Sequence, residues 1–445
     1  MTFHGALGTL CVAVVSVAFS PDLPFAAPNQ ATVAFTNVTV IDGTGRAPQP
    51  GVTVLISGDR IARIGRSGEV PIPAGTQRVD GTGKFLIPGL SDMHVHLTDA
   101  RPSAIPALVA HGVTGVRDMG SLLRELDEWR VRIDEGTLIG PRIVRAAHPQ
   151  RRSRPVQLAV ADAAQARGAV RALAKAGVDF IKIHKTLSRE QFLAIMNEAK
   201  QVGLPIAGHI PEAVTPEEAS DSGIASIEHT ESLFQNAGGY VNMPHDQMLE
   251  AMAALFRRFA KNGTFYTPCL IMYKASADWR DFTPQPQSKY VARSANARMQ
   301  SVAQQYRNAP EVIAGRKRVL GDFLVLVGLM RKNGVKVMVG TDLSDGRIFP
   351  GFSVHEEMAL LVQAGFTPDE AIQAATRLPA EYLRLRDAGT IEEGKRADFV
   401  LLSANPLADI RNTTRIEAVV LRGQLLNRAR LDALLHDAER LAAEN

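Results

Sequence analysis

The stretch VDFIKIHKTLS, residues 178–188, contains a short apolar strand followed by the start of a helix. Ser188, with Gln191 three residues later, has the spacing of a helix capping box. Lys182 lies inside the apolar run, where an ammonium group costs free energy unless it is paired or loses its charge. One unit of the fold is therefore a strand with a polar residue near its end, followed by a helix.

The same order of strand and helix recurs through the middle of the chain. Eight strand candidates are visible, mostly separated by helix signals: KFLIPGLSDMHVHL (84–97), GVTGVRDMG (112–120), PRIVRAA (141–147), VDFIKIH (178–184), PIAGHI (205–210), ASIEHT (225–230), GTFYTPCL (263–270) and VKVMVGTD (335–342). Eight strands with intervening helices predict an α/β protein with a (β/α)8 TIM barrel. We expect the barrel to span residues 88–385, with extra helices in the long connection from about 270 to 334.

Both ends of the chain show a different pattern, in which β-branched residues alternate with others between glycine turns. The pattern occurs in ATVAFTNVTVIDGTG (31–45) and GVTVLISGDRIARIG (51–65), and it returns in GTIEEGKRADFVLLSANP (389–406) and RIEAVVLRGQLLN (415–427). We predict that residues 31–87 and 386–430 together form a β-sandwich that flanks the barrel. Residues 431–445 are predicted to form an amphipathic helix.

The composition is that of a globular protein with room for more than one structural unit. The chain has 445 residues, of which 45% are hydrophobic and 22% charged, and its formal net charge is +4. The arginine-rich segment 142–154 has no interleaved aromatic residues, so we expect a small-molecule substrate and no nucleic-acid partner. Cys11 and Cys269 are too few for a disulfide framework or a cysteine-based metal site. Whether the chain forms a homo-oligomer stays open.

The N-terminus resembles a secretory signal peptide. Residues 6–20 form an apolar run too short to span a bilayer comfortably, and a segment rich in proline and alanine follows. We therefore expect residues 1–30 to be a signal peptide and linker, and the mature protein to be periplasmic or secreted, without a membrane span. The first five residues contain no lysine or arginine, which leaves a cytoplasmic location as the alternative.

Six polar residues lie near the ends of five predicted barrel strands. They are His94 and His96 on the first strand, Lys182 on the fourth, His209 on the fifth, His229 on the sixth and Asp342 on the eighth. Barrel enzymes carry their catalytic residues at this end of the strands, and imidazole and carboxylate groups are good ligands of zinc and similar divalent ions. Because residues two apart project to the same side of a strand, His94 and His96 can bind one ion together. The histidines and the aspartate suffice for one ion, or for two ions with one ligand missing.

Lys182 supplies the missing ligand only if its chemistry changes. An ammonium group has no lone pair and repels a cation. Burial beside two cations lowers the pKa of a lysine, and a neutral amine can react with carbon dioxide to form a carbamate. That group is anionic and has one oxygen for each of two ions, so Lys182 can become a bridge. Lys185 lies three positions further on with the opposite strand parity, so we expect it to face away.

The chain resembles the amidohydrolase superfamily of metal-dependent hydrolases over residues 33–428. FLIPGLSDMHVHL looks like the first-strand motif of that superfamily, GVTGVRDMG like the second, and the GTD at 340–342 like the eighth-strand aspartate. DFIKI is similar to the subgroup with a lysine bridge, which includes imidazolonepropionase-related prolidases. The resemblance implies two divalent ions, usually zinc, one held by His94, His96, carboxylated Lys182 and Asp342 and the other by carboxylated Lys182, His209 and His229.

Such a site predicts hydrolysis of an amide (C–N) bond, in a dipeptide or an N-acyl amino acid. Two ions lower the pKa of a water that bridges them, and Asp342 would act as general base and then as general acid. Four residues are candidates for contact with the substrate: Arg117, His148, Tyr266 and His355. Their structural alternatives are, in the same order, a salt bridge, a loop surface, side-chain packing and the first turn of a helix.

Three other functions stay open from the sequence alone. Glu212 lies three residues after His209, a spacing that resembles deaminases of this superfamily with a single ion. Lys182 argues against a deaminase, because a single ion needs no bridge. A lactone or phosphotriester hydrolase would use the same two ions. A non-catalytic scaffold would be expected to have lost some of the six residues, and all of them are present.

Overall fold

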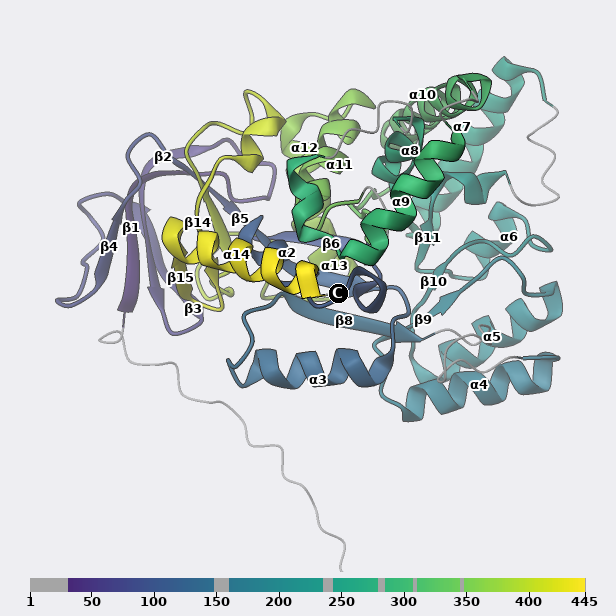
Figure 1. Ribbon diagram of the computed structural model, residues 1–445, viewed down its shortest axis with the longest axis horizontal. Coiled ribbons are helices and arrows are strands. Elements are labelled where there is room, and N and C mark those ends of the chain that lie inside the picture. Colours follow the sequence, from purple (N-terminus) through teal and green to yellow (C-terminus); the bar gives the residue numbers. More distant parts are fainter. Residues whose placement is uncertain are drawn as a thin grey trace, which may run out of the picture.

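The computed structural model describes residues 31–147, 160–234, 243–278, 285–306, 310–344 and 348–444. The expected signal peptide and linker, residues 1–30, lie outside these ranges. None of the helices in the described part of the chain is long and apolar enough to cross a lipid bilayer. A barrel surrounded by helices lies beside a second sheet that both ends of the chain build (Figure 1).

Seven consecutive strands form the parallel sheet of the barrel, and each pairs with its neighbour in the sequence. They are β6 (Leu90–Val95), β7 (Val113–Asp118), β8 (Arg142–Ala147), β9 (Phe180–Ile183), β10 (Ile206–Gly208), β11 (Ser226–Glu228) and β12 (Phe265–Thr267). Their residues are mostly buried, as expected for a parallel sheet covered by helices on the outside. The predicted α/β barrel is therefore confirmed.

The eighth predicted strand, residues 335–342, closes the barrel through hydrogen bonds without forming a regular strand. On one side Met93 N donates to Val339 O at 2.9 Å, which ties the segment to β6. On the other side Tyr266 N donates to Lys336 O at 2.9 Å, which ties it to β12. The first and last parts of the barrel are thus joined through this segment.

Close packing explains why the eighth segment is irregular. A Cβ atom on Gly340 would lie 2.4 Å from Thr267 Cγ2 and 2.9 Å from His94 Cβ, so only glycine fits between the two neighbours. Asp342 then adopts the left-handed backbone conformation, with φ 59°. That conformation is uncommon for a residue other than glycine and ends the extended geometry.

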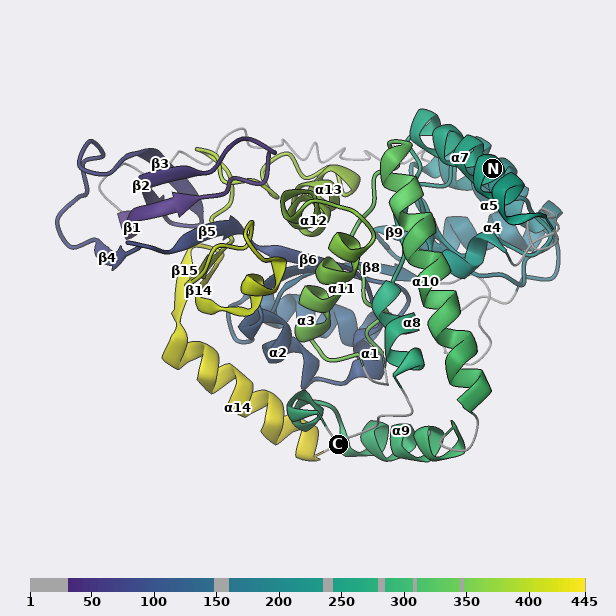
Figure 2. The ribbon, with the colours of Figure 1, turned by 90° about the horizontal axis from the view of Figure 1, so that it is seen from above.

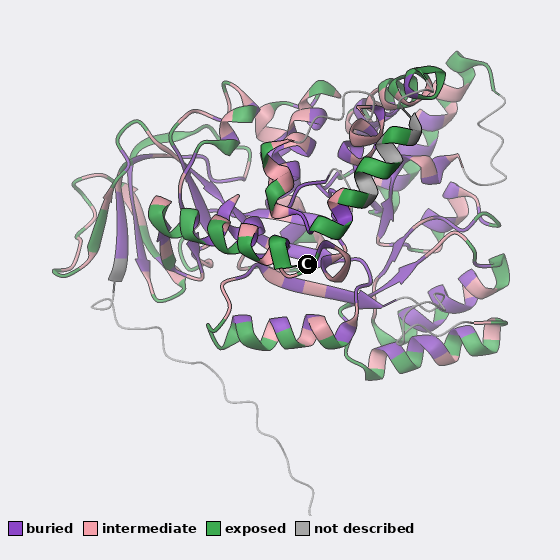
Figure 3. Ribbon diagram, in the orientation of Figure 1, coloured by how far each residue is buried: buried purple, intermediate pink, exposed green. Residues whose placement is uncertain are grey.

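Helices cover the outside of the barrel (Figures 1 and 2). They are α1 (Leu97–Ala100), α2 (Ala104–Ala110), α3 (Leu123–Asp134), α4 (Ala163–Lys175), α5 (Arg189–Val202), α6 (Pro216–Asp221), η2 (Thr230–Leu233), α7 (His245–Asn262), α11 (Phe352–Gln363), α12 (Pro368–Ala375) and α13 (Arg377–Tyr382). In α3, α4 and α5 one face is buried and the opposite face is exposed (Figure 3), whereas every residue of α2 is buried. Ser188 and Gln191 form the predicted capping box at the start of α5.

The long connection after β12 holds extra helices, as predicted. They are α8 (Leu270–Ala277), η5 (Pro286–Tyr290), α9 (Arg293–Tyr306) and α10 (Pro310–Lys332). α8 and α10 pack against each other and against α11 (Figure 2).

The second sheet has strands from both ends of the chain. They are β1 (Ala31–Val40), β2 (Gln49–Ser57), β3 (Arg60–Arg66), β4 (Gln77–Asp80), β5 (Phe85–Pro88), β13 (Phe399–Leu402), β14 (Ile416–Leu421) and β15 (Gln424–Asn427). Their order is β15-β14-β13-β5-β1-β2-β3, with β4 paired to β1. The rings of Phe35 and Phe399 meet edge to face at 6.4 Å in its core, so the two ends of the chain share one hydrophobic interior.

One predicted strand, residues 84–97, divides between the two sheets. β5 pairs with β13 of the second sheet, and β6 of the barrel begins directly after Gly89. A Cβ on Gly89 would lie 2.3 Å from Thr114 Oγ1, so the chain crosses between the sheets at a residue without a side chain. The expectation of a single barrel strand is therefore wrong for its first half.

The C-terminal helix, α14 (Arg428–Glu444), follows β15 directly and begins three residues before the predicted start at residue 431. It runs from the second sheet to the barrel and packs against α2 (Figure 1). The short helix η6 (Ile410–Thr414) makes a further connection, because it packs against α11.

Candidate metal centre

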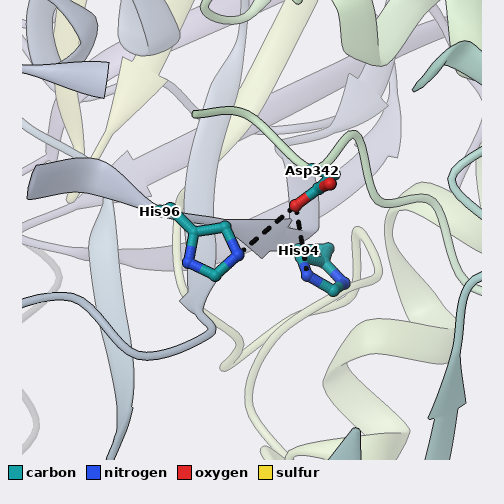
Figure 4. Close-up of side chains that lie close together, drawn as sticks. All are labelled: His94, His96 and Asp342. Carbon is teal, nitrogen blue, oxygen red and sulfur yellow. Dashed lines mark ion pairs between the residues drawn. The ribbon is translucent and has the colours of Figure 1, made fainter. Parts of the chain in front are cut away.

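Three of the six polar residues converge where the barrel closes. His94 lies on β6, His96 follows that strand, and Asp342 is the last residue of the eighth segment (Figure 4). Asp342 Oδ1 lies 3.4 Å from His94 Nε2 and 3.3 Å from His96 Nε2. The three ligand atoms lie within 4.8 Å of one another, close enough to hold one metal ion. Asp342 N donates to His94 O at 2.8 Å, so the backbone fixes this arrangement.

Two further histidines extend this group. The ring centroid of His229 lies 4.6 Å from that of His94 and 4.7 Å from that of His209. His229 stands directly after β11 and is buried, and burial lowers the pKa of its ring. The structure therefore brings histidines from β6, β10 and β11 together at one end of the barrel.

Lys182 lies on β9 near the same histidines. Its side chain is 1% exposed, and its Nζ atom has no hydrogen-bond partner among the residues that the structure describes. Burial lowers the pKa of Lys182 to about 8, although the charges of Glu228 and Asp342 oppose that shift. Its charge in turn lowers the pKa of Asp342, so the two side chains are near each other.

The chemistry of these groups fits a divalent cation. In the described part of the chain, Lys182 Nζ, His94 Nε2 and His229 Nδ1 are buried atoms without a hydrogen-bond partner. Buried polar groups are normally paired, so several unpaired ones in one place point to a missing partner. Neutral imidazole nitrogens and a carboxylate are the ligands that zinc and related ions prefer.

A long match to a known family accompanies this geometry. The profile described as the Amidohydrolase family matches residues 85–426, which include all six residues. The chain belongs to this family. The superfamily resemblance of the sequence is thereby confirmed.

Individual relatives of this amidohydrolase agree with the family. Deacetylase Atu3266 of Agrobacterium fabrum is 41% identical over 101 residues, which are 21% of this chain and 24% of that protein. The chain thus matches about a quarter of the length of that relative. Imidazolonepropionase of Anaeromyxobacter sp. (strain K) is 24% identical over 420 residues, 85% of this chain and 91% of the relative.

Solved structures show the same fold. A Bifidobacterium longum protein assigned as a prolidase is 28% identical, with a TM-score of 0.69, and the match covers 92% of this chain and 100% of that one. Family and neighbours together indicate a metal-dependent hydrolase that acts on carbon–nitrogen bonds.

Two buried carboxylates behind the histidines of this amidohydrolase are absent from the sequence prediction. Asp92 accepts hydrogen bonds from His94 N at 3.2 Å and from Thr341 Oγ1 at 2.6 Å, which ties β6 to the eighth segment. Burial raises the pKa of Asp92 to about 7. Glu228 Oε2 lies 3.0 Å from His94 Nδ1. A signal was present for both, because each is an acid inside an apolar strand close to a candidate histidine.

The structure gives Arg117 and Tyr266 partners inside the protein, although both were predicted to contact the substrate. Arg117 is fully buried in the barrel interior, where its guanidinium group pairs with Glu228 at 2.7 Å. Tyr266 is also fully buried, and its hydroxyl donates to His229 O at 3.0 Å. Tyr266 therefore contacts a histidine of the ligand group directly, and Arg117 contacts the group through Glu228. His148 lies outside the described residues.

His355, also predicted to contact the substrate, has a partner within the protein for each ring nitrogen. It is buried on α11, where Nε2 lies 3.0 Å from His111 O and Nδ1 lies 2.9 Å from Thr413 Oγ1. The ring therefore joins α11 to η6 and to the end of α2. Burial, and secondly the charge of His111, lower its pKa from 6.5 to about 3.

The buried His355 predicts a loss of stability in acid. Below pH 6.5 the unfolded chain binds a proton at His355 that the folded protein excludes, so the free energy of unfolding falls with pH by about 1.4 kcal/mol per unit until about pH 3. We expect His355→Gln to show a shallower fall between pH 6.5 and 4 in urea unfolding. The control is His436→Gln on α14, which replaces an exposed histidine by the same residue and is expected to keep the wild-type slope. Equal slopes for wild type and His355→Gln would contradict the prediction.

Three further polar residues follow β9 and β10 in the sequence. Glu212 is exposed, and its backbone N donates to Lys185 O at 3.0 Å. Lys185 is half-buried, in contrast to the fully buried Lys182. His184 follows β9, and its ring centroid lies 4.5 Å from that of His209, although the sequence analysis assigned it no role.

Proposed function

We propose that this amidohydrolase uses two divalent metal ions to cleave an amide bond in a dipeptide or an N-acyl amino acid. The observation that supports it best is the environment of Lys182. A lysine that is 1% exposed, with no hydrogen-bond partner for Nζ in the described part of the chain, stands among histidines and an aspartate. A carbamate on Lys182, formed from carbon dioxide, converts this costly buried amine into an anionic ligand.

The proposed ligands follow from the placement of the residues around the closing segment. His94, His96 and Asp342 would hold one ion, for which their ligand atoms are grouped. His209 and His229 would hold the other, and the carbamate on Lys182 would join the two ions. Zinc is the expected metal, because it prefers imidazole nitrogen and carboxylate oxygen. When bound, the ions lower the pKa of water and polarise a carbonyl group.

Asp342 is the proposed carrier of the proton. Burial alone would raise its pKa, but the hydrogen bond from His96 and the charges of His229 and Lys182 lower it below the usual value. The carboxylate is therefore ionised and can accept a proton from the attacking water. It can then donate the same proton to the leaving nitrogen, as a general base followed by a general acid.

The choice of substrate rests on the neighbours of the chain. The structure assigned as a prolidase matches nearly the whole chain at 28% identity. Dipeptides and N-acyl amino acids both present an amide next to a carboxylate and so form one chemical class. A deaminase is less well supported, because Glu212 is exposed at the rim and its proton role would need a position beside the histidines.

Metal analysis and a substrate screen test the proposal together. Protein purified with zinc and bicarbonate is expected to contain two ions per chain and to hydrolyse dipeptides or N-acyl amino acids, but not lactones, phosphotriesters or adenine. Protein stripped by a chelator is the control, and it should regain activity when zinc is returned. One ion per chain with release of ammonia from adenine would favour the deaminase. No metal and no turnover would favour a scaffold.

A further inference from the structure

A buried chain of charged side chains runs through the barrel interior behind the ligand group. Arg117 on β7 donates from Nη2 to Glu228 Oε1 on β11 at 2.7 Å, and Glu228 Oε2 lies 3.0 Å from His94 Nδ1 on β6. All three side chains are fully buried. The series of contacts Arg117–Glu228–His94 therefore ends at one of the three residues grouped for metal binding.

The contact with Glu228 selects one form of the His94 ring. Because Glu228 Oε2 lies at hydrogen-bond distance from Nδ1, a neutral imidazole that donates to this oxygen carries its proton on Nδ1. The lone pair is then on Nε2, which is the atom that lies 3.4 Å from Asp342 Oδ1. The opposite tautomer would place a proton on the atom that faces Asp342 and His96.

Arg117 in turn holds Glu228. The two oxygens of Glu228 have different partners, because Oε1 accepts from Arg117 and from Ser226 Oγ, at 2.5 Å, while Oε2 faces His94. A buried carboxylate without a partner would be strongly unfavourable, and the guanidinium group compensates its charge. With Oε1 held by Arg117 and Ser226, Glu228 keeps Oε2 directed at the ring.

The position of Arg117 is itself fixed from several sides. Its Nε donates to Met93 O at 2.7 Å, and its Nη2 donates to Thr267 Oγ1 at 3.2 Å. The guanidinium carbon lies 5.6 Å from the ring centre of Phe180 and 4.8 Å from that of Tyr382. With bonds to three strands and aromatic rings around it, the side chain has little room to move.

We propose that Arg117 and Glu228 act as a positioning pair, which sets the tautomer and the orientation of His94 for metal binding. This inference rests on the proposed function, since it requires that His94 binds a metal ion. Partners of this kind orient metal-binding histidines in other proteins, and their loss typically lowers metal affinity by about 10- to 100-fold.

The affinity of Glu228→Gln for Zn²⁺ tests the pair. Glutamine has one oxygen that accepts hydrogen bonds, where glutamate has two. Its side-chain nitrogen can only donate, so it cannot replace the second oxygen that faces Arg117 or His94. We expect the apparent Kd for Zn²⁺, measured by competition with a chelator, to rise by about 10- to 100-fold. The matched control is Glu198→Gln, because Glu198 on α5 is also buried and pairs with Arg171 at 2.8 Å, away from the histidines. The control should bind Zn²⁺ as the wild type does.

A second measurement needs no variant of the pair. Metal-free wild-type protein labelled with ¹⁵N-histidine should show the Nδ1–H tautomer for His94, assigned by the signal that disappears in His94→Gln. The Nε2–H tautomer would overturn the positioning pair, and so would a folded Glu228→Gln with unchanged affinity for Zn²⁺. Wild-type protein that takes up no Zn²⁺ would instead contradict the proposed function, because the tautomer measurement does not depend on metal.

Discussion

Replacing Lys182 with alanine is expected to lower kcat/KM for the amide substrate by about 1,000-fold and to reduce the metal content from two ions to one. A metal ion stabilises the transition state by several kcal/mol, and each 1.36 kcal/mol corresponds to a factor of ten in rate. The variant removes the group that is proposed to join the two sets of ligands. Steady-state kinetics and metal analysis of the same preparation measure both effects.

Lys185→Ala is the matched control for this prediction. Lys185 lies in the same segment but is half-buried, and its backbone oxygen rather than its side chain bonds to Glu212. We expect activity within about twofold of the wild type, as for most substitutions away from a site. Added formate or acetate should restore part of the activity of Lys182→Ala, since a small carboxylate can supply the two oxygens of the carbamate. Full activity and two ions in Lys182→Ala would show that the lysine is no bridge.

Asp342→Asn is the second variant with a large expected effect. The amide keeps the size of the side chain but cannot accept a proton, so kcat should fall by about 10²- to 10⁴-fold. KM should change little if Asp342 acts mainly in the chemical step. The loss of one carboxylate ligand also weakens the first ion, so kinetics must be measured at saturating zinc.

Glu212→Gln distinguishes the two proposed carriers of the proton. Glu212 is exposed at the rim, and its replacement should leave amide hydrolysis unchanged. If Glu212→Gln abolished turnover while Asp342→Asn retained it, Asp342 could not be the general base, and the deaminase alternative would return.

The barrel could be predicted from the sequence because each strand is short, apolar and followed by a helix signal. The same reasoning identified the six polar residues, because a polar side chain near the end of an apolar strand is easy to recognise in a sequence. The expected start of the barrel at residue 88 lies close to the crossing between β5 and β6. Two details need the three-dimensional structure. The crossing occurs at Gly89, which contacts Thr114, and the irregular eighth segment depends on Gly340 between Thr267 and His94. These contacts join residues that are distant in the sequence.

The contacts of Arg117 could not be read from the sequence. A polar residue on a barrel strand points inward in the same way whether it faces the open end or the closed interior. Arg117 on β7 bonds to Ser226 and Glu228 on β11, a strand that is not its neighbour in the sheet. No local pattern in β7 shows this contact. Asp92 and Glu228 were overlooked for a different reason, because each is an acid inside an apolar strand close to a candidate histidine and that signal was not used.

The hydrogen bonds that close the barrel have a consequence for how the protein is held together. His94 stands at the beginning of the barrel and Asp342 at its end, and their side chains meet across the seam between these two parts of the chain. An ion bound to both side chains would hold the two parts of the chain together. Because such an ion binds only when these parts are in contact, it would favour the closed barrel by mass action. Completing the circle of strands and completing the catalytic centre would then be a single event.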